Sequence, residues 1–379
     1  MVQRTIIVGG GIAGLSAAIG LRRVGHDVRL FEQASEIRPL GAAISLWGNA
    51  LAALDRLGCG DAVREASAPI DRLRSTTRGG RPLFGPVDIS ANDSWLVRRA
   101  DLQAILMRSA GDDIVSLDTR IENIEQSQNG VIVTTADGVS HAADLLVLAD
   151  GIHSKHASDL IGNMARYAGY RGFLGLADGF ADDGEAMNEE IWHGRERAGL
   201  FDATGGQRYW FFIYSALEDG EMTHDALDET ILNWPERVRQ AVLRTPHDRR
   251  ISGAIHARSV PKRLGRGRVI AIGDAAHAME PNLGQGACQG IEDAEALARW
   301  ANTCSPEDLL SAMERERLPR IAHYMKASAR IGWMAHRASP LSRRAIEGVM
   351  RATPAAMERW QIAREIAVPE VLRPAAPVD

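Results

Sequence analysis

The stretch GDAAHAMEPNLGQGACQGIEDA, residues 273–294, places glycines where something must approach the backbone closely. Four apolar residues before it predict a buried strand, and the apolar residues after it recur at helical spacing. Pro281 prevents a helix from starting earlier, so the helix N-terminus falls at Gly284, Gln285 and Gly286. Free amides at such a terminus attract an anion or the electron-rich edge of a ring. A glycine-rich turn without a ligand is the alternative at this point.

A second glycine motif lies in RTIIVGGGIAGLSAAIGLRRVGHDVRLFEQ, residues 4–33, which predicts a strand, a helix and a second strand. Gly9, Gly11 and Gly14 match GxGxxG. In that motif the first glycine permits the turn, the second lets the backbone reach a pyrophosphate, and the third packs helix on strand. Glu32 lies 18 positions after Gly14, where a carboxylate binds the hydroxyls of an adenosine ribose. An acidic residue there disfavours a 2′-phosphate, so FAD or NAD is favoured over NADP as the bound nucleotide.

The composition excludes several function classes. A net charge of -5, with no run of Lys or Arg longer than two, gives no general attraction to nucleic acid or to an anionic membrane. The three cysteines are widely spaced and form no CxxC pair, so neither a disulfide framework nor a metal site is expected. The first strand begins too early for a signal peptide, and no apolar run is long enough to span a membrane. We expect a cytoplasmic protein.

The elements that must position these motifs alternate along the chain. Residues 145–148 predict a central parallel strand, and residues 167–258 predict isolated strands with one helix near 229–243. The fold class is therefore α/β, a Rossmann-like dinucleotide-binding domain with an inserted antiparallel β-sheet domain for the substrate and a C-terminal helical region. The expected parts are the dinucleotide-binding domain (1–70, 98–166 and 259–300), the substrate domain (71–97 and 167–258) and the C-terminal helices and tail (301–379).

Three segments have the same pattern, in which an apolar strand ends in a small or acidic residue. They are GxGxxG, LVLADGIHS and IAIGDAAH. In open α/β sheets, ligands bind at those strand ends. This set and its order resemble the class A flavoprotein monooxygenases, the family of 4-hydroxybenzoate hydroxylase, over residues 6 to about 351. The motifs are most similar to those of the urate hydroxylase and alkylquinolone hydroxylase types within that family.

The resemblance implies FAD as the cofactor and assigns its contacts. Gly9, Gly11, Gly14 and Glu32 would bind the AMP half of FAD, and Arg99 would face the pyrophosphate. Asp150 and Gly151 match the DG motif of the family. Asp274 would bind the ribityl chain, and the isoalloxazine would be lined by Pro281, Gly284, Gln285 and Gly286. Amides at the positive end of a helix would stabilise the negative N1/C2 edge of reduced flavin. One position departs from the family pattern: Ala157 stands seven residues after Asp150, where relatives carry an arginine connected with nicotinamide use.

The resemblance also implies the reaction. NADH or NADPH reduces FAD, O2 adds at flavin C4a, and the hydroperoxide transfers one oxygen to a small aromatic ring. Arg197 and Tyr209 lie twelve residues apart, a spacing that fits facing strands of one hairpin. The candidate catalytic residues are Arg197, Tyr209 and Pro281. Urate hydroxylases have Arg and Tyr at similar positions, so a urate-type substrate is the first hypothesis. A phenolic acid or an alkylquinolone is the alternative substrate, and Tyr209 can instead be a core residue.

Other functions fit the same fold. A flavin-dependent halogenase or reductase, or a redox sensor that binds FAD without hydroxylation, is the competing interpretation. His277, at a strand end, is expected to brace the loop rather than to titrate, and His247 to be a surface or structural residue. The helical tail, with Trp333 and Met334, offers a packing face within a monomer, a homodimer face or a membrane-surface face.

Overall fold

A six-stranded sheet forms the first layer of the computed structural model, which describes residues 3–37, 41–180 and 188–373. Its order is β18-β19-β12-β1-β2-β8, and all neighbours are parallel except β18 with β19. The strands are β1 (Arg4–Val8), β2 (Asp27–Phe31), β8 (Val115–Ser116), β12 (Leu145–Leu148), β18 (Gly265–Arg266) and β19 (Val269–Ala271). The predicted central strand over residues 145–148 is confirmed, because β12 lies between β1 and β19.

Four parallel strands of this sheet end at the same edge. Val8 of β1 pairs with Phe31 of β2 and with Leu148 of β12, and Leu148 pairs with Ala271 of β19. The segments that follow these strands therefore start side by side, although they are far apart in the sequence.

Helices and short turns surround the sheet. The helices are α1 (Ile12–Arg23), α2 (Gly48–Leu57), α3 (Gly60–Glu65), α4 (Arg99–Ala110), α5 (Lys155–Ile161), α8 (Asp274–His277) and α9 (Gly286–Ala301), and the turns are η1 (Ser90–Asn92), η2 (Asp112–Ile114) and η5 (Pro281–Leu283). Helices α1 and α9 approach closely at Gly20, where an added Cβ would lie 2.7 Å from the side chain of Ala298. This contact fixes α9, and the loop before it, against the first βαβ unit.

A seven-stranded sheet forms the second layer, in the order β17-β13-β16-β15-β14-β5-β6. Its strands are β5 (Arg72–Thr77), β6 (Pro82–Asp88), β13 (Arg166–Ala177), β14 (Asn188–His193), β15 (Glu196–Ala203), β16 (Gln207–Ser215) and β17 (Ile251–Ala257), with the turn η3 (Thr204–Gly206) before β16. Neighbours are antiparallel except β14 with β5, where the segment from residues 71–97 joins the later strands. The expected α/β class with an inserted, mainly antiparallel sheet is confirmed.

Two details differ from the sequence-based expectation. The helix expected near residues 229–243 is two helices, α6 (His224–Ile231) and α7 (Glu236–Leu243), because Pro235 precedes α7 and has no N–H to continue a helix. The end of segment 71–97 leaves the large sheet as β7 (Trp95–Arg98) and pairs with β3 and β4 instead. The remaining elements of this part are β3 (Ala43–Leu46), β4 (Ser67–Pro69) and η4 (His247–Arg249).

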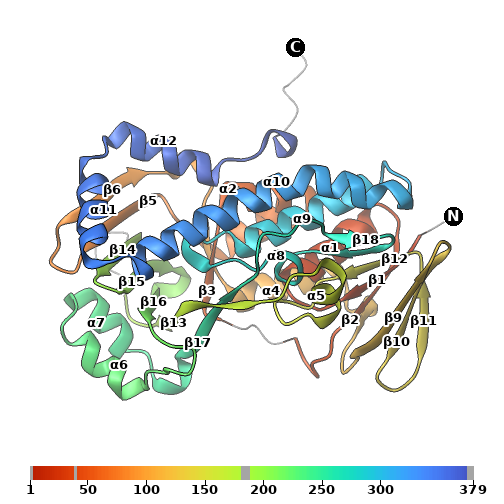
Figure 1. Ribbon diagram of the computed structural model, residues 1–379, viewed down its shortest axis with the longest axis horizontal. Helices are drawn as coiled ribbons and strands as arrows, with labels where there is room; N and C mark the ends of the chain where they lie inside the picture. Colours follow the sequence, from red (N-terminus) through yellow and green to blue (C-terminus); the bar gives the residue numbers. More distant parts are fainter. Residues whose placement is uncertain (1–2, 38–40, 181–187, 374–379) are drawn as a thin grey trace, which may run out of the picture.

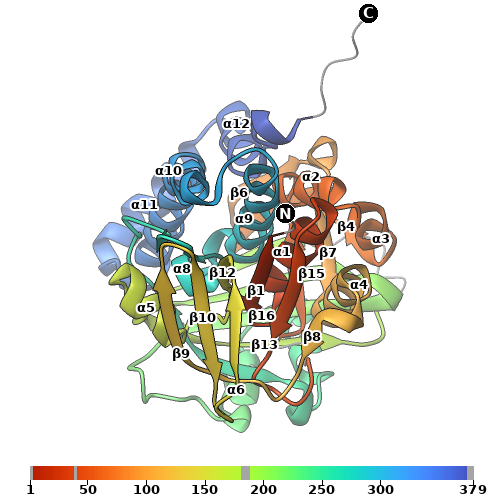
Figure 2. The same cartoon turned by 90° about the vertical axis from the view of Figure 1, so that its right-hand side faces the viewer.

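A separate three-stranded sheet, β9 (Ile121–Ser127), β10 (Gly130–Thr135) and β11 (Ser140–Ala143), stands beside β12 and β1 (Figure 2). The C-terminal elements are α10 (Pro306–Gly332), η6 (Trp333–Arg337), α11 (Pro340–Ala352), α12 (Ala355–Ile366) and η7 (Glu370–Leu372). Figure 1 shows α10 running the length of the molecule from α9 to the seven-stranded sheet, with α11 and α12 next to β6. Within the described ranges, no helix has the length and apolar character needed to cross a membrane.

Candidate cofactor and substrate cavity

One cavity of about 940 Å³ extends from the strand ends of the six-stranded sheet to the seven-stranded sheet. Twelve of the fourteen predicted site residues line it. They are Gly9, Gly11, Glu32, Arg99, Asp150, Gly151, Arg197, Tyr209, Asp274, Pro281, Gly284 and Gly286. Gly14 and Gln285 do not line it. The structure therefore brings the predicted residues together, and their roles toward a ligand remain our predictions.

The three glycines of the GxGxxG motif differ in what surrounds them, and so in why glycine is needed at each position. Gly9 has a φ of 105°, and a Cβ there would lie 2.5 Å from the carbonyl oxygen of Ala149. A Cβ on Gly14 would lie 2.0 Å from the carbonyl oxygen of Gly9, so Gly14 is a packing residue of the turn. A Cβ on Gly11 would meet nothing within 4 Å, and Gly11 lines the cavity. Gly11 is thus the position where the bare backbone faces open space that a ligand would fill.

The Glu32 carboxylate is fixed by backbone amides at the end of β2. Its Oε2 accepts a hydrogen bond from the Gly10 N–H at 2.7 Å, and its Oε1 accepts one from the Ala34 N–H at 2.9 Å. An ionised carboxylate has about four acceptor sites. Glu32 can therefore accept two further hydroxyl donors in the cavity without losing its own anchors.

Polar groups in the middle of the cavity have unmet hydrogen-bonding capacity. Oδ1 of Asp150 is buried and has no hydrogen-bond partner among the described residues, and burial raises the pKa of Asp150. Arg99 begins α4, and its side chain makes no hydrogen bond to a described residue; burial lowers its pKa, which Asp274 opposes. A buried polar group without a partner is costly, so these two side chains fit a ligand that carries hydroxyls and phosphates.

The N-terminus of α9 opens on the same cavity. Helix α9 begins at Gly286, and no side chain caps its first amides. Gly284 has a φ of 62°, and Trp47 holds the loop by donating from Nε1 to the Leu283 carbonyl at 2.9 Å. The Gln285 side chain points elsewhere, because its Nε2 donates to the Glu365 carbonyl at 3.1 Å. The Gln285 side chain is thus not available for the predicted ring contact.

A buried ion pair braces this loop from behind. Nε2 of His277 lies 2.5 Å from Oδ2 of Asp293, which also accepts the Gly273 N–H at 2.9 Å. Arg317 donates from Nε to the other oxygen of Asp293 at 2.8 Å. Burial alone would raise the pKa of Asp293, but His277 and Arg317 hold it well below its usual range. His277 is fully buried and does not line the cavity, in agreement with the bracing role expected for it.

Arg258 joins two of the strand-end loops, and sequence reasoning did not single it out. Its guanidinium donates to the carbonyl of Ile152 at 2.7 Å, to that of Asn163, and to that of Asp274 at 3.2 Å. The contacts with Ile152 and Asp274 span 106 and 16 positions of sequence, so no local pattern reveals them. Ala157, where the family pattern has an arginine, is buried in α5 and does not line the cavity.

The two residues predicted to bind the substrate, Arg197 and Tyr209, lie on paired strands of the second sheet, as the hairpin prediction required. Arg197 of β15 pairs with Ile213, and Tyr209 of β16 pairs with Phe201, so the two lie four residues apart in register and on the same face. Four residues of strand correspond to roughly 13 Å. The cavity wall between them includes Phe211, whose ring needs Gly199 because a Cβ there would lie 2.1 Å from it.

Arg197 and Tyr209 differ in their partners. Arg197 is 3% exposed and donates from Nη2 to Asn282 Oδ1 at 2.5 Å, with Glu190 at 3.5 Å from Nη1. Its Nε is buried and has no partner in the described part of the chain. Burial raises the pKa of Tyr209 to about 12, which Arg99 opposes, so the phenol is neutral. The cavity therefore combines a cation that has a free donor with a neutral hydroxyl.

Helix α12 contributes a wall that the sequence did not predict. Gln361, Ile362, Glu365 and Ile366 line the cavity, together with Leu73 of β5 and Phe84 of β6. No local sequence signal indicates this contact, because α12 lies about 150 residues beyond the substrate strands that it helps to enclose.

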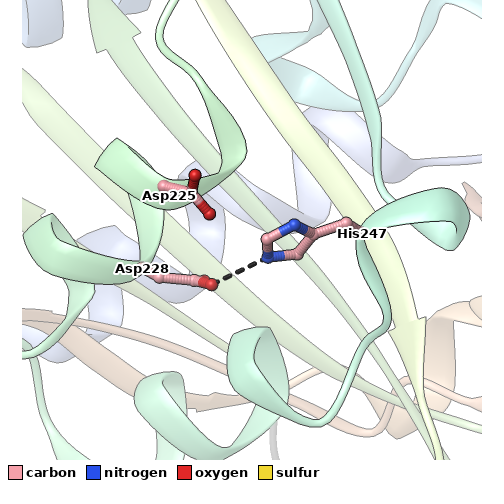
Figure 3. A group of neighbouring side chains, drawn as sticks. All are labelled: Asp225, Asp228 and His247. Atoms are coloured by element: carbon pink, nitrogen blue, oxygen red, sulfur yellow. Dashed lines mark hydrogen bonds and ion pairs between the residues drawn. The ribbon is translucent and has the colours of Figure 1, made fainter.

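A cluster of polar side chains lies outside the cavity, where α6 and η4 meet. Asp225 and Asp228 of α6 and His247 of η4 place their side-chain oxygens and nitrogen within 4.8 Å of one another (Figure 3). Asp228 bonds His247 at 2.9 Å and Arg250 at 2.6 Å. Because the buried Arg250 already supplies a positive charge, we assign this group to an ion-pair cluster that ties α6 to η4.

Comparison with known proteins identifies the family. The model of the FAD binding domain family matches residues 3–328. The aurachin C monooxygenase/isomerase of Stigmatella aurantiaca is 33% identical over 339 residues, which are 86% of this chain and 88% of that protein. A FAD-dependent urate hydroxylase of Klebsiella pneumoniae is 32% identical over 334 residues, 84% of this chain and 87% of that protein.

Solved structures agree with this assignment. The crystal structure of Klebsiella pneumoniae HpxO complexed with FAD and uric acid has a TM-score of 0.90 and 26% identity, and covers 97% of this chain and 98% of that one. The 2-methyl-3-hydroxypyridine-5-carboxylic acid oxygenase has a TM-score of 0.77 at 24% identity, covers 94% of this chain and 96% of that one, and supports the fold alone.

The chain therefore belongs to the FAD binding domain family. Within that family it is a FAD-dependent monooxygenase of the class A aromatic hydroxylases, as the sequence resemblance implied. FAD is its cofactor, and the open backbone at Gly11 and the unpartnered Oδ1 of Asp150 fit that molecule.

Proposed function

We propose that this enzyme uses NADH or NADPH and O2 to hydroxylate a small, planar N-heteroaromatic substrate, with a urate-type ring as the first candidate. The observation that carries this proposal is Arg197, a buried guanidinium on the wall of the cavity whose Nε lacks a partner. An unpaired buried donor is costly, and an anionic or enolic oxygen would satisfy it.

The surroundings of Arg197 suit an aromatic ring. Phe201, Tyr209 and Phe211 share its sheet face and line the cavity, and the guanidinium carbon lies 5.8 Å from the ring centre of Phe211. Flat rings stack favourably on such side chains. The neutral hydroxyl of Tyr209 can donate to an acceptor at the far end of the ring. A relative at 32% identity is named a urate hydroxylase, which supports the same substrate class.

The bound flavin would supply the redox chemistry, the activation of O2 for insertion of one oxygen. The protein's own residues then bind and orient. Gly11, Glu32 and Arg99 would hold the nucleotide half, and Asp274 the ribityl chain. Amides at Gly284 to Gly286 would stabilise negative charge on the ring, and Pro281 would lie beside it. Arg197 would hold the substrate as its anion.

The choice between NADH and NADPH is open in this proposal. Lys155 and His156 lie next to Ala157 and are the neighbouring candidates to replace the family's arginine. His156 lines the cavity, and its Nε2 lies 3.3 Å from the Ile121 carbonyl. Both cosubstrates therefore belong in every assay.

A second candidate is a lipophilic quinoline. Leu73, Phe84, Ile362 and Ile366 give the substrate end of the cavity an apolar wall, which suits an alkyl chain better than it suits urate. The aurachin C monooxygenase relative supports this candidate by its name. A phenolic acid would use Arg197 in the same way as urate.

The experiment is NADH and NADPH oxidation by the FAD-loaded enzyme, with catalase present, across urate, 6-hydroxynicotinate, salicylate, 4-hydroxybenzoate and a 2-alkylquinolone. We expect one N-heteroaromatic compound to accelerate oxidation many-fold and to gain one oxygen by mass spectrometry. If reduced nicotinamide is consumed at the same slow rate with every compound, the reductase or sensor interpretation replaces the hydroxylase.

Arg197→Met tests the residue that carries the proposal. Loss of a charge-assisted hydrogen bond should raise KM for an anionic substrate roughly 10- to 150-fold, which corresponds to about 1.5 to 3 kcal/mol. The affinity for FAD should stay the same. An unchanged KM would remove Arg197 from the substrate site.

A further inference from the structure

A buried hydrogen-bond network is centred on Asn282, which lines the cavity beside Arg197. Asn282 Oδ1 accepts from Arg197 at 2.5 Å, while Asn282 Nδ2 donates to Tyr170 Oη at 3.0 Å and to Glu280 Oε2 at 3.1 Å. Nδ2 also lies 3.0 Å from the carbonyl oxygen of Ser328 in α10. Each of these five residues is at most 9% exposed. The network therefore joins the loop before α9, the substrate sheet and α10.

The network allows only one orientation of the Asn282 amide. The Ser328 carbonyl and an ionised Glu280 carboxylate can only accept hydrogen bonds, and the Arg197 guanidinium can only donate them. A flipped amide would set Nδ2 against the donors of Arg197 and Oδ1 against the oxygens of Glu280 and Ser328. The amide oxygen is thus held toward Arg197 by acceptors on its other side.

Glu280 is itself fixed from two directions. Tyr170 donates from its hydroxyl to Glu280 Oε2 at 2.8 Å, and Arg337 of η6 donates to Oε1 at 2.9 Å. Gly332, at the end of α10, makes room for this carboxylate, because a Cβ there would lie 1.8 Å from Oε2. The position of Glu280 therefore depends on the junction of α10 and η6.

We propose that Asn282 is a positioning residue that aims the Arg197 guanidinium into the cavity, and that Glu280 fixes Asn282 for this task. The inference rests on the proposed function, in which Arg197 holds an anionic substrate. Nη2 is bound to Asn282 and Nη1 lies near Glu190, whereas Nε has no partner among the described residues. Asn282 acts through Arg197, so its effect must disappear when Arg197 is absent.

The test is a double-mutant cycle in the FAD-loaded enzyme with Asn282→Leu, Arg197→Met and the double variant. For the anionic substrate found in the panel, Asn282→Leu should raise KM about tenfold or more, with kcat changed much less. In the Arg197→Met background the same substitution should have no further effect on KM. Additive effects of the two substitutions on KM would overturn the positioning role.

Gly332→Ala perturbs the network from a position that does not line the cavity. Its new methyl group must displace the Glu280 carboxylate, so KM should rise as in Asn282→Leu, by a smaller factor. Gly348→Ala in α11 is the matched control, because a Cβ there meets nothing within 4 Å. A Gly332→Ala enzyme with the KM of the control would show that Glu280 does not fix Asn282.

A crystal structure of FAD-loaded Asn282→Leu separates this inference from the proposed function. If no compound accelerates nicotinamide oxidation in the unmodified enzyme, the proposed function fails, yet the position of Arg197 can still be compared. A guanidinium that turns away from its place beside Asn282 supports the positioning role. A guanidinium that keeps its place without the Asn282 amide contradicts it.

Discussion

At the scale of single residues, glycines of one motif have separable tasks. Gly14 is required by the fold of the turn, because its Cβ position lies 2.0 Å from the Gly9 carbonyl oxygen. Gly11 has no such neighbour and faces the cavity. The two positions therefore distinguish what the protein needs to fold from what the ligand needs to bind.

Gly11→Ala and Gly14→Ala test this separation. The Gly11 variant should fold with nearly unchanged thermal stability but bind FAD at least tenfold more weakly, because its methyl group occupies ligand space. The Gly14 variant should lose stability even without FAD, since the turn must shift to admit a Cβ. Thermal unfolding of the apoproteins and FAD titration measure the two effects. A Gly11→Ala protein that binds FAD normally would contradict our placement of the nucleotide.

At the scale of elements, α9 depends on charges supplied by α10. Arg317 is 2% exposed and lies 2.8 Å from Asp293, and its Nη1 bonds Glu292, whose side chain is also buried. Arg320 supplies a second cation to Glu292 at 2.6 Å. These ion pairs hold the helix whose N-terminus opens on the cavity.

Arg317→Met should be strongly destabilising, because it removes the arginine that pairs with the buried carboxylates of Asp293 and Glu292. Breaking a buried ion pair from one side costs about 3–5 kcal/mol. The exposed Arg315, two positions earlier on the same helix, provides the matched control, and Arg315→Met should change stability little. Denaturant unfolding of the three proteins measures the difference. Equal stability of the two variants would show that the ion pairs do not support α9.

A charged side chain at the N-terminus of α9 should prevent flavin binding. Gly286→Glu would place a carboxylate at the start of the helix, where Gly286 lines the cavity and its Cβ position is 4.0 Å from Asp274 Oδ1. Negative charge and bulk there should abolish retention of FAD during purification. The ratio of flavin to protein absorbance measures this, and full FAD content in the variant would count against ring binding at this loop.

At the scale of the whole molecule, the C-terminal region meets the substrate sheet through a buried histidine. His336 of η6 stacks on Tyr170 of β13 with ring centres 4.2 Å apart, and its Nδ1 lies 3.3 Å from both Ser215 Oγ and the Arg195 carbonyl. Burial lowers the pKa of His336 to about 3, and nearby Arg197 acts in the same direction.

This histidine should make stability depend on pH. The unfolded chain binds a proton at His336 below a pKa of about 6.5, whereas the folded protein does not until about pH 3, so stability falls as the pH drops below 6.5. Between pH 8 and pH 5.5 the unmodified protein should lose about 1.4 kcal/mol more than His336→Gln. Denaturant unfolding of both proteins at the two pH values checks this. Parallel losses would show that His336 is protonated in the folded state.

The sequence predicted the parts of the site that local patterns encode. The glycines at 9, 11 and 14, Glu32 and the start of α9 follow from strand, turn and helix signals within a few tens of residues. Asn282 with Tyr170 and Arg258 with Ile152 depend on contacts across 112 and 106 positions, and the α12 wall depends on how the tail folds back. Such contacts are set by packing of distant elements, which a single sequence does not reveal.

The central claim is that this cavity holds FAD beside an aromatic substrate and inserts one atom of O2 into it. The most direct test is turnover under ¹⁸O₂ of the panel compound that most accelerates nicotinamide oxidation, with mass spectrometry of the product. We expect one ¹⁸O atom in the product for each NADH or NADPH used productively, and loss of that product in Arg197→Met at the same substrate concentration. A product that carries only oxygen from water, or reduced nicotinamide whose electrons all appear in hydrogen peroxide, would contradict the account.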